Sequence, residues 1–216
     1  SLIKLIKVKK LKNKYEIFIK VKGQSVSFYS KSDNKNNLYN ILATIASISL
    51  YIDVKAFKKD IFLNFKIPKG RGDISKIRLR KKEIFLVDES YNSNPLSLKS
   101  ALENYDKIES KNSKKYLILG DMLELGKNSI SQHKAMSKIV NKTKINQVYV
   151  IGRYIKETFK GLKSNKKAKI LNNKFSIINL INDNLNNNDY LMIKGSNSTG
   201  LHKITNDLKQ KNINVI

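Results

Sequence analysis

The chain has 216 residues, 40% of them hydrophobic, which is enough to bury the core of one large domain or of two modest ones. The chain has no cysteine, and its two histidines lack ligand-like spacing, so we expect neither disulfides nor metal sites. We expect a reducing, cytoplasmic setting. The formal net charge of +26 would suit nucleic acid or an anionic membrane, but the basic residues are nearly all lysines scattered along the chain, so we expect neither partner.

Residues 1–31 alternate apolar and polar side chains, a period that is typical of half-buried strands. Gly23 and Gln24 mark a turn within this segment, so we expect a β-meander or a hairpin. The chain begins at Ser1 and is already in this strand pattern. We therefore expect it to be a piece of a longer protein.

From Asp33 the apolar period changes to three and four residues, which predicts a packed helix entered through a run of capping asparagines. Asn40 lies three residues after Asn37, so both amides are expected to face the same way from the first turn. A helix start of this kind can meet an anion or a nucleotide. A second short helix is predicted from Val54 to about Phe65.

The loop from Ile67 to Asp73 contains two glycines and a proline around Arg71. Such a loop lets the backbone approach a ligand, and it also suits an interdomain linker with an exposed arginine. We place the domain boundary here, which gives domains of residues 1–72 and 73–216.

After this boundary, continuously apolar strands alternate with amphipathic helices. This order predicts an α/β domain with a Rossmann-like, mostly parallel sheet covered on both faces. The expected strands are residues 74–80, 83–87, 115–119, 147–151, 168–171 and 190–193. The expected helices are residues 96–108, 131–140, 155–162, 177–185 and 201–209.

Polar residues follow four of these strands, at the sheet edge where open α/β folds bind ligands. They are residues 88–92, 120–126, 152–153 and 194–198. Asp88 and Glu89 end one strand and point to opposite faces, so they are not expected to act as a paired acid and base. Lys194 is the best candidate for a charge that meets an anionic group. His133, inside the next helix, is expected to be a partly exposed surface residue.

Three motifs occur in a fixed order in the second domain. They are D-x-S-Y-N-x-N-P at residues 88–95, L-G-D-M-L-E-L-G at 119–126 with a histidine shortly after, and K-G-S at 194–196. Together they resemble the Mur ligases. Upstream, residues 36–40 resemble the H-N-x-x-N motif of that family, and Gly70 with Arg71 resembles its G-R.

The resemblance implies that residues 1–72 are the C-terminal remnant of the central, ATP-binding domain, and that residues 73–216 are the C-terminal Rossmann-like domain. By the same resemblance, Asn37 and Asn40 would lie at the adenine of ATP. Arg71 and Asp88 would lie at its ribose and phosphates.

The reacting groups would lie at the same sheet edge. Lys194 and Ser196 are the catalytic candidates that the resemblance implies, in the crevice facing the reacting groups. Tyr91, Asn92 and Asn94 would bind the incoming substrate.

The implied reaction is an ATP-dependent ligation in peptidoglycan precursor synthesis. The motifs are most similar to those of family members that add D-alanyl-D-alanine to UDP-N-acetylmuramoyl-tripeptide through an acyl phosphate. The cofactors would be ATP and Mg²⁺, with the metal ligands expected upstream, and we expect a monomer. The alternatives are another Mur ligase or a folate-type relative, and a basic nucleic-acid-binding module without enzymatic activity.

The sequence departs from the family pattern at three positions. Asn36 stands where the family has histidine, Glu89 where it has aspartate, and Asn197 where arginine is usual. No G-x-x-x-x-G-K-[ST] loop is present to hold a triphosphate. The chain alone is therefore expected to be inactive.

Overall fold

The computed structural model describes residues 2–65, 68–79, 81–110 and 112–210. The chain divides into two compact units, residues 1–67 and 68–216. Within the described ranges, no helix has the length and apolar character needed to cross a membrane.

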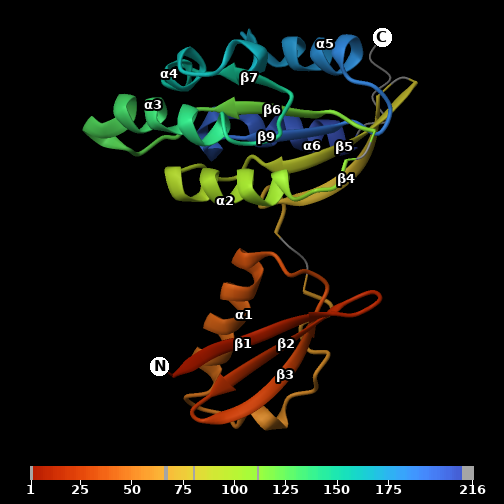
Figure 1. Ribbon diagram of the computed structural model, residues 1–216, viewed down its shortest axis with the longest axis vertical. Coiled ribbons are helices and arrows are strands. Elements are labelled where there is room, and N and C mark those ends of the chain that lie inside the picture. Colours follow the sequence, from red (N-terminus) through yellow and green to blue (C-terminus); the bar gives the residue numbers. More distant parts are fainter. Residues whose placement is uncertain (1, 66–67, 80, 111, 211–216) are drawn as a thin grey trace. The chain divides into compact units, whose positions relative to one another are not determined.

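The first unit is a three-stranded antiparallel sheet with one long helix (Figure 1). Its elements are β1 (Ile3–Lys10), β2 (Tyr15–Val21), β3 (Gln24–Ser30) and α1 (Lys35–Ile48). Its core joins alternate residues of β2 and β3 to one face of α1, and it consists of Ile17, Ile19, Val21, Phe28, Leu38, Ile41, Ile45 and Val54. The β-meander and the following helix predicted from the two periodicities are confirmed.

The prediction of a second helix in this unit, from Val54 to about Phe65, is wrong. Only a 3-10 turn at Val54–Ala56 forms, and a series of tight turns follows it. The carbonyl of Lys59 accepts a hydrogen bond from Tyr29 N at 2.6 Å, which ties this segment to the end of β3. Because that carbonyl is used by a strand, the segment cannot continue as a regular helix. Its end, residues 66–67, lies outside the described residues.

The second unit is built on a six-stranded sheet in the order β4-β5-β9-β6-β7-β8. The strands are β4 (Asp73–Leu79), β5 (Lys82–Glu89), β6 (Lys115–Gly120), β7 (Gln147–Ile151), β8 (Lys167–Ile170) and β9 (Tyr190–Lys194). β4 pairs antiparallel with β5, and every other pair is parallel. Arg80, the expected end of the first strand, lies outside the described residues.

Helices cover both faces of this sheet, as the continuously apolar strands predicted (Figure 1). They are α2 (Pro95–Asp106), α3 (Ser129–Val140), α4 (Ile155–Lys160), α5 (Lys174–Asn184) and α6 (Leu201–Gln210). Short 3-10 turns occur at Gly126–Asn128, Ser164–Lys166 and Asn197–Thr199. One core cluster joins the sheet to α2, α3 and α4, and the other joins it to α5 and α6. The strand order of this sheet brings the carboxyl ends of β5, β9, β6 and β7 side by side at one edge.

The division between the two units lies five residues before the expected boundary. Residues 68–72 belong to the second unit because their backbone bonds to the end of β5. Gly72 N donates to Asp88 O at 2.7 Å, and Tyr91 N donates to Gly70 O at 3.1 Å. A side chain on Gly70 would meet Cβ of Tyr91 at 2.9 Å, so this close packing needs glycine.

Candidate active site at the carboxyl edge of the sheet

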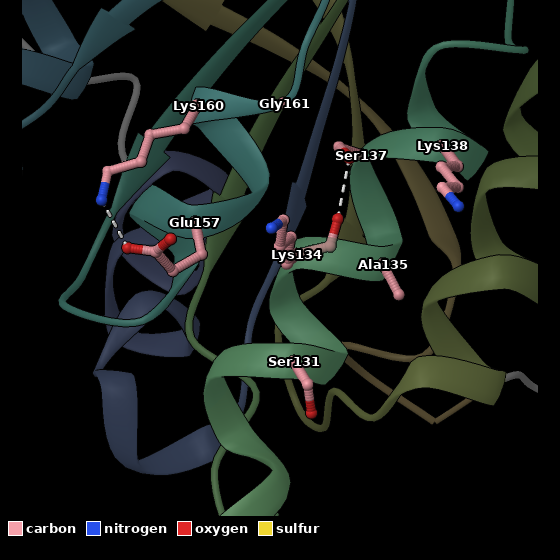
Figure 2. A pocket seen from close by; sticks show the side chains of 8 residues that line it. All are labelled: Ser131, Lys134, Ala135, Ser137, Lys138, Glu157, Lys160 and Gly161. Carbon is pink, nitrogen blue, oxygen red and sulfur yellow. Dashed lines mark hydrogen bonds and ion pairs between the residues drawn. The ribbon is translucent and has the colours of Figure 1, made fainter.

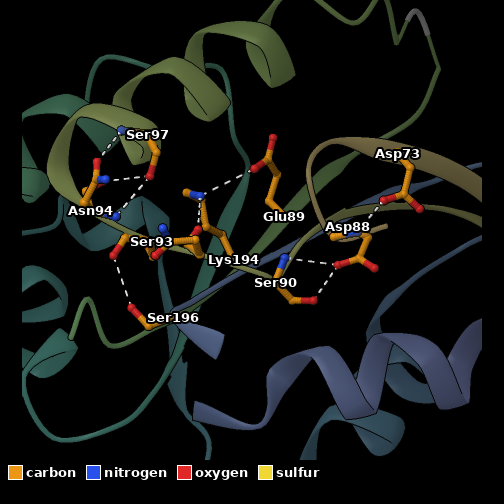
Figure 3. A network of polar contacts seen from close by, with 11 residues as sticks. Asp73, Asp88, Glu89, Ser90, Ser93, Asn94, Ser97, Lys194 and Ser196 are labelled. Carbon is orange, nitrogen blue, oxygen red and sulfur yellow. Dashed lines mark hydrogen bonds and ion pairs between the residues drawn. The ribbon is translucent and has the colours of Figure 1, made fainter. Parts of the chain in front are cut away.

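Lys194 ends β9 with its ammonium group inside the protein (Figure 3). Its side chain is 1% exposed, and Nζ donates to Asn92 O at 2.8 Å and lies 3.4 Å from Oε2 of Glu89. Burial lowers the pKa of Lys194, while the charge of Glu89 acts in the opposite direction. A catalytic lysine was predicted here. The structure places it under the turn that follows β5, where it links two neighbouring strand ends.

Glu89 forms the other half of this buried pair. Burial raises the pKa of its carboxyl above the usual value, against the lowering effect of Lys194. The side chain is 17% exposed. A Cβ on Gly72 would lie 2.9 Å from Oε1 of Glu89, so this carboxylate also lies against the loop that carries Arg71. We call Glu89, Asn92 and Lys194 the Glu89 network.

Asp88 points to the opposite face of β5, as the strand alternation predicted. Its Oδ1 accepts hydrogen bonds from the backbone N and the hydroxyl of Ser90, and its Oδ2 lies 2.5 Å from Nζ of Lys209. Lys209 also pairs with Asp73, and Ser90 shares a hydrogen bond with Thr205. We call these five residues the Asp88 network. Both oxygens of Asp88 already have protein partners, and the residue is 1% exposed.

Ser196, the second predicted catalytic residue, is buried and joins three loops (Figure 3). Its hydroxyl accepts a hydrogen bond from Leu123 N at 2.9 Å and donates one to Ser93 O at 3.1 Å. Its backbone N donates to Asp121 O. In this arrangement the hydroxyl holds the loops after β5, β6 and β9 together.

Arg71 and Tyr91 form an exposed pair at the same edge. The guanidinium carbon of Arg71 lies 4.7 Å from the ring centroid of Tyr91, in cation–π contact. Both side chains are exposed. The pair therefore presents a fixed positive charge and an aromatic surface on the outside of the Glu89 network.

Asn92 and Asn94, the other predicted substrate residues, have different local roles. Asn94 caps α2: its Oδ1 accepts from Ser97 N at 2.8 Å, and the hydroxyl of Ser97 accepts from Asn94 N in return. Asn92 is exposed and uses its backbone carbonyl for Lys194. Pro95 is the first residue of α2, where its missing N–H is tolerated.

The motif loop after β6 is held from inside by His133. This residue is fully buried, so the expectation of a partly exposed surface histidine is wrong. Its Nε2 accepts a hydrogen bond from Met122 N at 2.9 Å, and Nδ1 donates to Ser129 O. Asp121 completes the loop by accepting hydrogen bonds from the backbone N of Arg153 and Ile155, at the start of α4.

Asn37 and Asn40 belong to the first unit, at the start of α1. Asn37 is buried, whereas Asn40 is exposed, so the two side chains do not share one environment. Ser30 gives its hydroxyl proton to Ser32 O and accepts from Nδ2 of Asn37 at 3.1 Å. This fixes the orientation of the amide. Oδ1 of Asn37 is left buried and without a hydrogen-bond partner among the described residues.

A cavity of about 540 Å³ lies between α3 and α4 (Figure 2). Its lining includes Lys134, Lys138 and Lys160, but none of the motif residues. Lys160 is paired with Glu157, and Ser137 donates to Lys134 O. The cavity is therefore separate from the cluster at the strand ends, and we do not assign the predicted chemistry to it.

Sequence reasoning placed Asp88 at the nucleotide, and it did not show that both carboxylate oxygens have partners inside the protein. It also missed Lys209, whose partner Asp88 lies 121 positions away in the chain and which belongs to no motif.

Known proteins resemble this chain over most of its length. A family model described as "Mur ligase, glutamate ligase domain" matches residues 76–197. The UDP-N-acetylmuramoyl-tripeptide–D-alanyl-D-alanine ligase of Rickettsia prowazekii is 31% identical over 170 residues, which cover 78% of this chain and 36% of that protein. The enzyme of the same name from Buchnera aphidicola subsp. Acyrthosiphon pisum is 32% identical, with 94% of this chain and 46% of that protein covered.

Solved structures show the same fold. The MurF ligase from Thermotoga maritima, crystallised in complex with ADP, matches with a TM-score of 0.72 and 19% sequence identity. The match covers 97% of this chain and 46% of that one. The chain thus spans less than half the length of the curated relatives and the solved structure that it matches.

Proposed function

The chain belongs to the Mur ligase family, and we propose that it forms part of an ATP-dependent ligase that joins D-alanyl-D-alanine to UDP-N-acetylmuramoyl-tripeptide. The relatives from Rickettsia prowazekii and Buchnera aphidicola are ligases named for this substrate pair, which supports the assignment. The observation that carries the proposal is the meeting of the three family motifs in one hydrogen-bonded cluster. Ser196 of the third motif bonds to Leu123 of the second and to Ser93 of the first.

We assign the first unit to the end of the central ATP-binding domain and the second unit to the C-terminal domain. The division then falls between residues 67 and 68. In this assignment the chain supplies one side of a composite active site. The phosphate-binding loop and the Mg²⁺ ligands would come from the upstream part of the ligase.

Asn37 fits the nucleobase of ATP. Its buried Oδ1 has no donor within the described part of the chain, and such a group costs free energy until a donor is provided. The exocyclic amino group of adenine is a donor of the right kind, whereas Asn40, exposed on the next turn, would contact the base from outside. The unpaired oxygen supports the adenine role predicted from the motif.

Arg71 fits the phosphates, because its guanidinium is exposed and held in place by Tyr91. For the ribose we propose Glu89 in place of the predicted Asp88. Both oxygens of Asp88 are used inside the protein, whereas Glu89 is partly exposed and adjoins the Arg71 loop.

Lys194 and Ser196 would act by positioning. Lys194 fixes the turn after β5 through Asn92 O, and Ser196 fixes the loops around it. Tyr91, Asn92 and Asn94 then form the surface that meets the dipeptide. The tripeptide carboxylate would take the terminal phosphoryl group of ATP and release ADP, and the dipeptide amine would then displace phosphate from the acyl phosphate to form the amide bond. Such a transfer depends on orientation and charge neutralisation, which a rigid sheet edge provides.

The test is an assay of the complete ligase that contains this chain. We expect phosphate release from ATP that requires both UDP-N-acetylmuramoyl-tripeptide and D-alanyl-D-alanine. Single amino acids should not replace the dipeptide. Equal rates with a single amino acid would favour another Mur ligase or a folate-type relative. Salt-dependent retention on DNA without any response to nucleotide would favour the binding module.

The matched variants are Asn37→Leu and Asn40→Leu in the same ligase. Asn37→Leu removes the acceptor oxygen that is proposed to meet the adenine amino group, so we expect a KM for ATP raised about tenfold, the cost of one polar contact to a bound ligand. The exposed Asn40→Leu should change it less. Equal KM values for wild type and Asn37→Leu would contradict the adenine role.

A further inference from the structure

The last described turn of α6 carries a lysine that no motif identifies. Nζ of Lys209 lies 2.5 Å from Oδ2 of Asp73 and 2.5 Å from Oδ2 of Asp88. The Lys209 side chain is 15% exposed and that of Asp88 is 2% exposed. Burial opposes the charge of Lys209, but the hydrogen bonds to the two carboxylates raise its pKa above the usual value. One ammonium group therefore bridges the first strand of the unit and the end of β5.

Both aspartates that Lys209 holds also contact the loop that carries Arg71, Asp73 through its carboxylate and Asp88 through its backbone carbonyl. Oδ1 of Asp73 accepts a hydrogen bond from Gly70 N at 2.7 Å. On the other side of the arginine, Gly72 N donates to Asp88 O at 2.7 Å. Gly70 and Gly72 both have positive φ angles, at 76° and 95°, where the backbone of glycine is intrinsically free. The loop keeps one shape because these bonds restrain it.

We propose that Lys209 is a positioning residue for Arg71. It neutralises Asp73 and Asp88 and so keeps the Asp73 carboxylate on Gly70 N, which sets where the exposed guanidinium of Arg71 lies on Tyr91. The inference rests on the proposed function only in assigning the phosphates of ATP as the group that Arg71 meets.

The effect of removing the ammonium group follows from the geometry. The two Oδ2 atoms lie 2.5 Å from one nitrogen, so they are no more than 5.0 Å apart. Without Lys209 they repel each other in a poorly solvated place, and the more exposed Asp73 is the one free to move outward. Its bond to Gly70 N is then lost, and the arginine loop becomes mobile.

The first experiment measures the loop directly in the 216-residue chain, by amide hydrogen exchange. In Lys209→Met, the amide of Gly70 should exchange at least tenfold faster, while those of β6 and β9 keep their wild-type protection. Lys209→Arg, which keeps a charge that can reach both carboxylates, should restore the protection. Lys203→Met, on the exposed side of the same helix, is the matched control and should change nothing. Unchanged exchange at Gly70 in Lys209→Met overturns the proposal.

If Lys209→Met unfolds the unit, Asp73→Asn takes its place. This variant leaves Asp88 paired with Lys209 and weakens the acceptor for Gly70 N. Faster exchange at Gly70, with β6 and β9 unaffected, supports the proposal. Wild-type exchange at Gly70 overturns it.

The second experiment uses the complete ligase. Lys209→Met should raise the KM for ATP at least fivefold and change kcat less, Lys209→Arg should restore it, and Lys203→Met should match wild type. A loosened loop with an unchanged KM for ATP overturns the positioning role. If the wild-type ligase shows no ATP-dependent activity at all, the proposed function fails. The hydrogen-exchange experiment still tests whether Lys209 restrains the loop, because it needs no ligase activity.

Discussion

Asp88 and Glu89 are neighbours on β5, yet their carboxylates meet opposite surroundings. In the Asp88 network both oxygens accept bonds from protein groups, and a lysine from α6 closes the cluster. In the Glu89 network one ammonium group lies 3.4 Å away, and the carboxylate is partly exposed beside Gly72. Because side chains alternate along a strand, Asp88 is bonded inside the protein, whereas Glu89 lies partly exposed near the loop that carries Arg71, where a ligand can reach it.

The largest effect should come from Lys194→Met, which breaks the buried pair. The change leaves Glu89 without its counter-charge and Asn92 O without its donor, so we expect a loss of about 3–5 kcal/mol in the free energy of unfolding. Urea unfolding of the whole chain, followed by circular dichroism, measures it. The double variant Lys194→Met with Glu89→Leu should recover most of the loss, because no charge is then left unpaired. A loss below about 1 kcal/mol would show that the pair is solvated like a surface salt bridge.

Asp88→Ala should have the next largest effect, about 2–4 kcal/mol, because Ser90 loses an acceptor inside the protein. The effect is smaller than that of Lys194→Met because Lys209 keeps Asp73 as a partner. Glu83→Ala is the matched control: it lies on the same strand, in a half-exposed pair with Lys76, and should leave the unfolding midpoint unchanged. Similar losses at both positions would mean that Asp88 is not the internal anchor.

Periodicity along the sequence predicted the elements that carry these two networks, but not all of the contacts within them. The strand and helix order of the second unit followed from periodicity, and the convergence of loops followed from parallel topology. The expected helix from Val54 failed because a long-range hydrogen bond to Tyr29 competed with it. Lys209 could not be found, because its role depends on carboxylates more than a hundred positions away.

Ser196→Ala tests, at a smaller scale, the link among the three loops that follow β5, β6 and β9. The hydroxyl accepts from Leu123 N and donates to Ser93 O, so we expect a loss of about 1–2 kcal/mol by urea unfolding. Ser198→Ala, two residues on and exposed, should be neutral. If stability is unchanged while the complete ligase loses activity, the catalytic role predicted from the motif is favoured over the structural one.

The smallest effect is a pH dependence that separates Glu89 from its neighbour. Burial raises the pKa of Glu89, so the native chain holds this proton more tightly than the unfolded chain does. The resulting stability is fully present below the unfolded value of 4.5 and is lost as pH rises through the raised native value. Glu89→Gln removes this titration. Wild type should therefore lose stability relative to Glu89→Gln as the pH rises from about 4 to about 7.

Urea unfolding of both chains at several pH values measures this difference, and Glu103→Gln on the exposed face of α2 is the control. The control should follow wild type at every pH, because its carboxylate is more than half exposed in a surface pair. Parallel curves for Glu89→Gln and wild type would mean that Lys194 compensates the burial of Glu89 fully. The carboxylate would then be held in the fold as firmly as Asp88, and the contrast between the two faces of β5 would disappear.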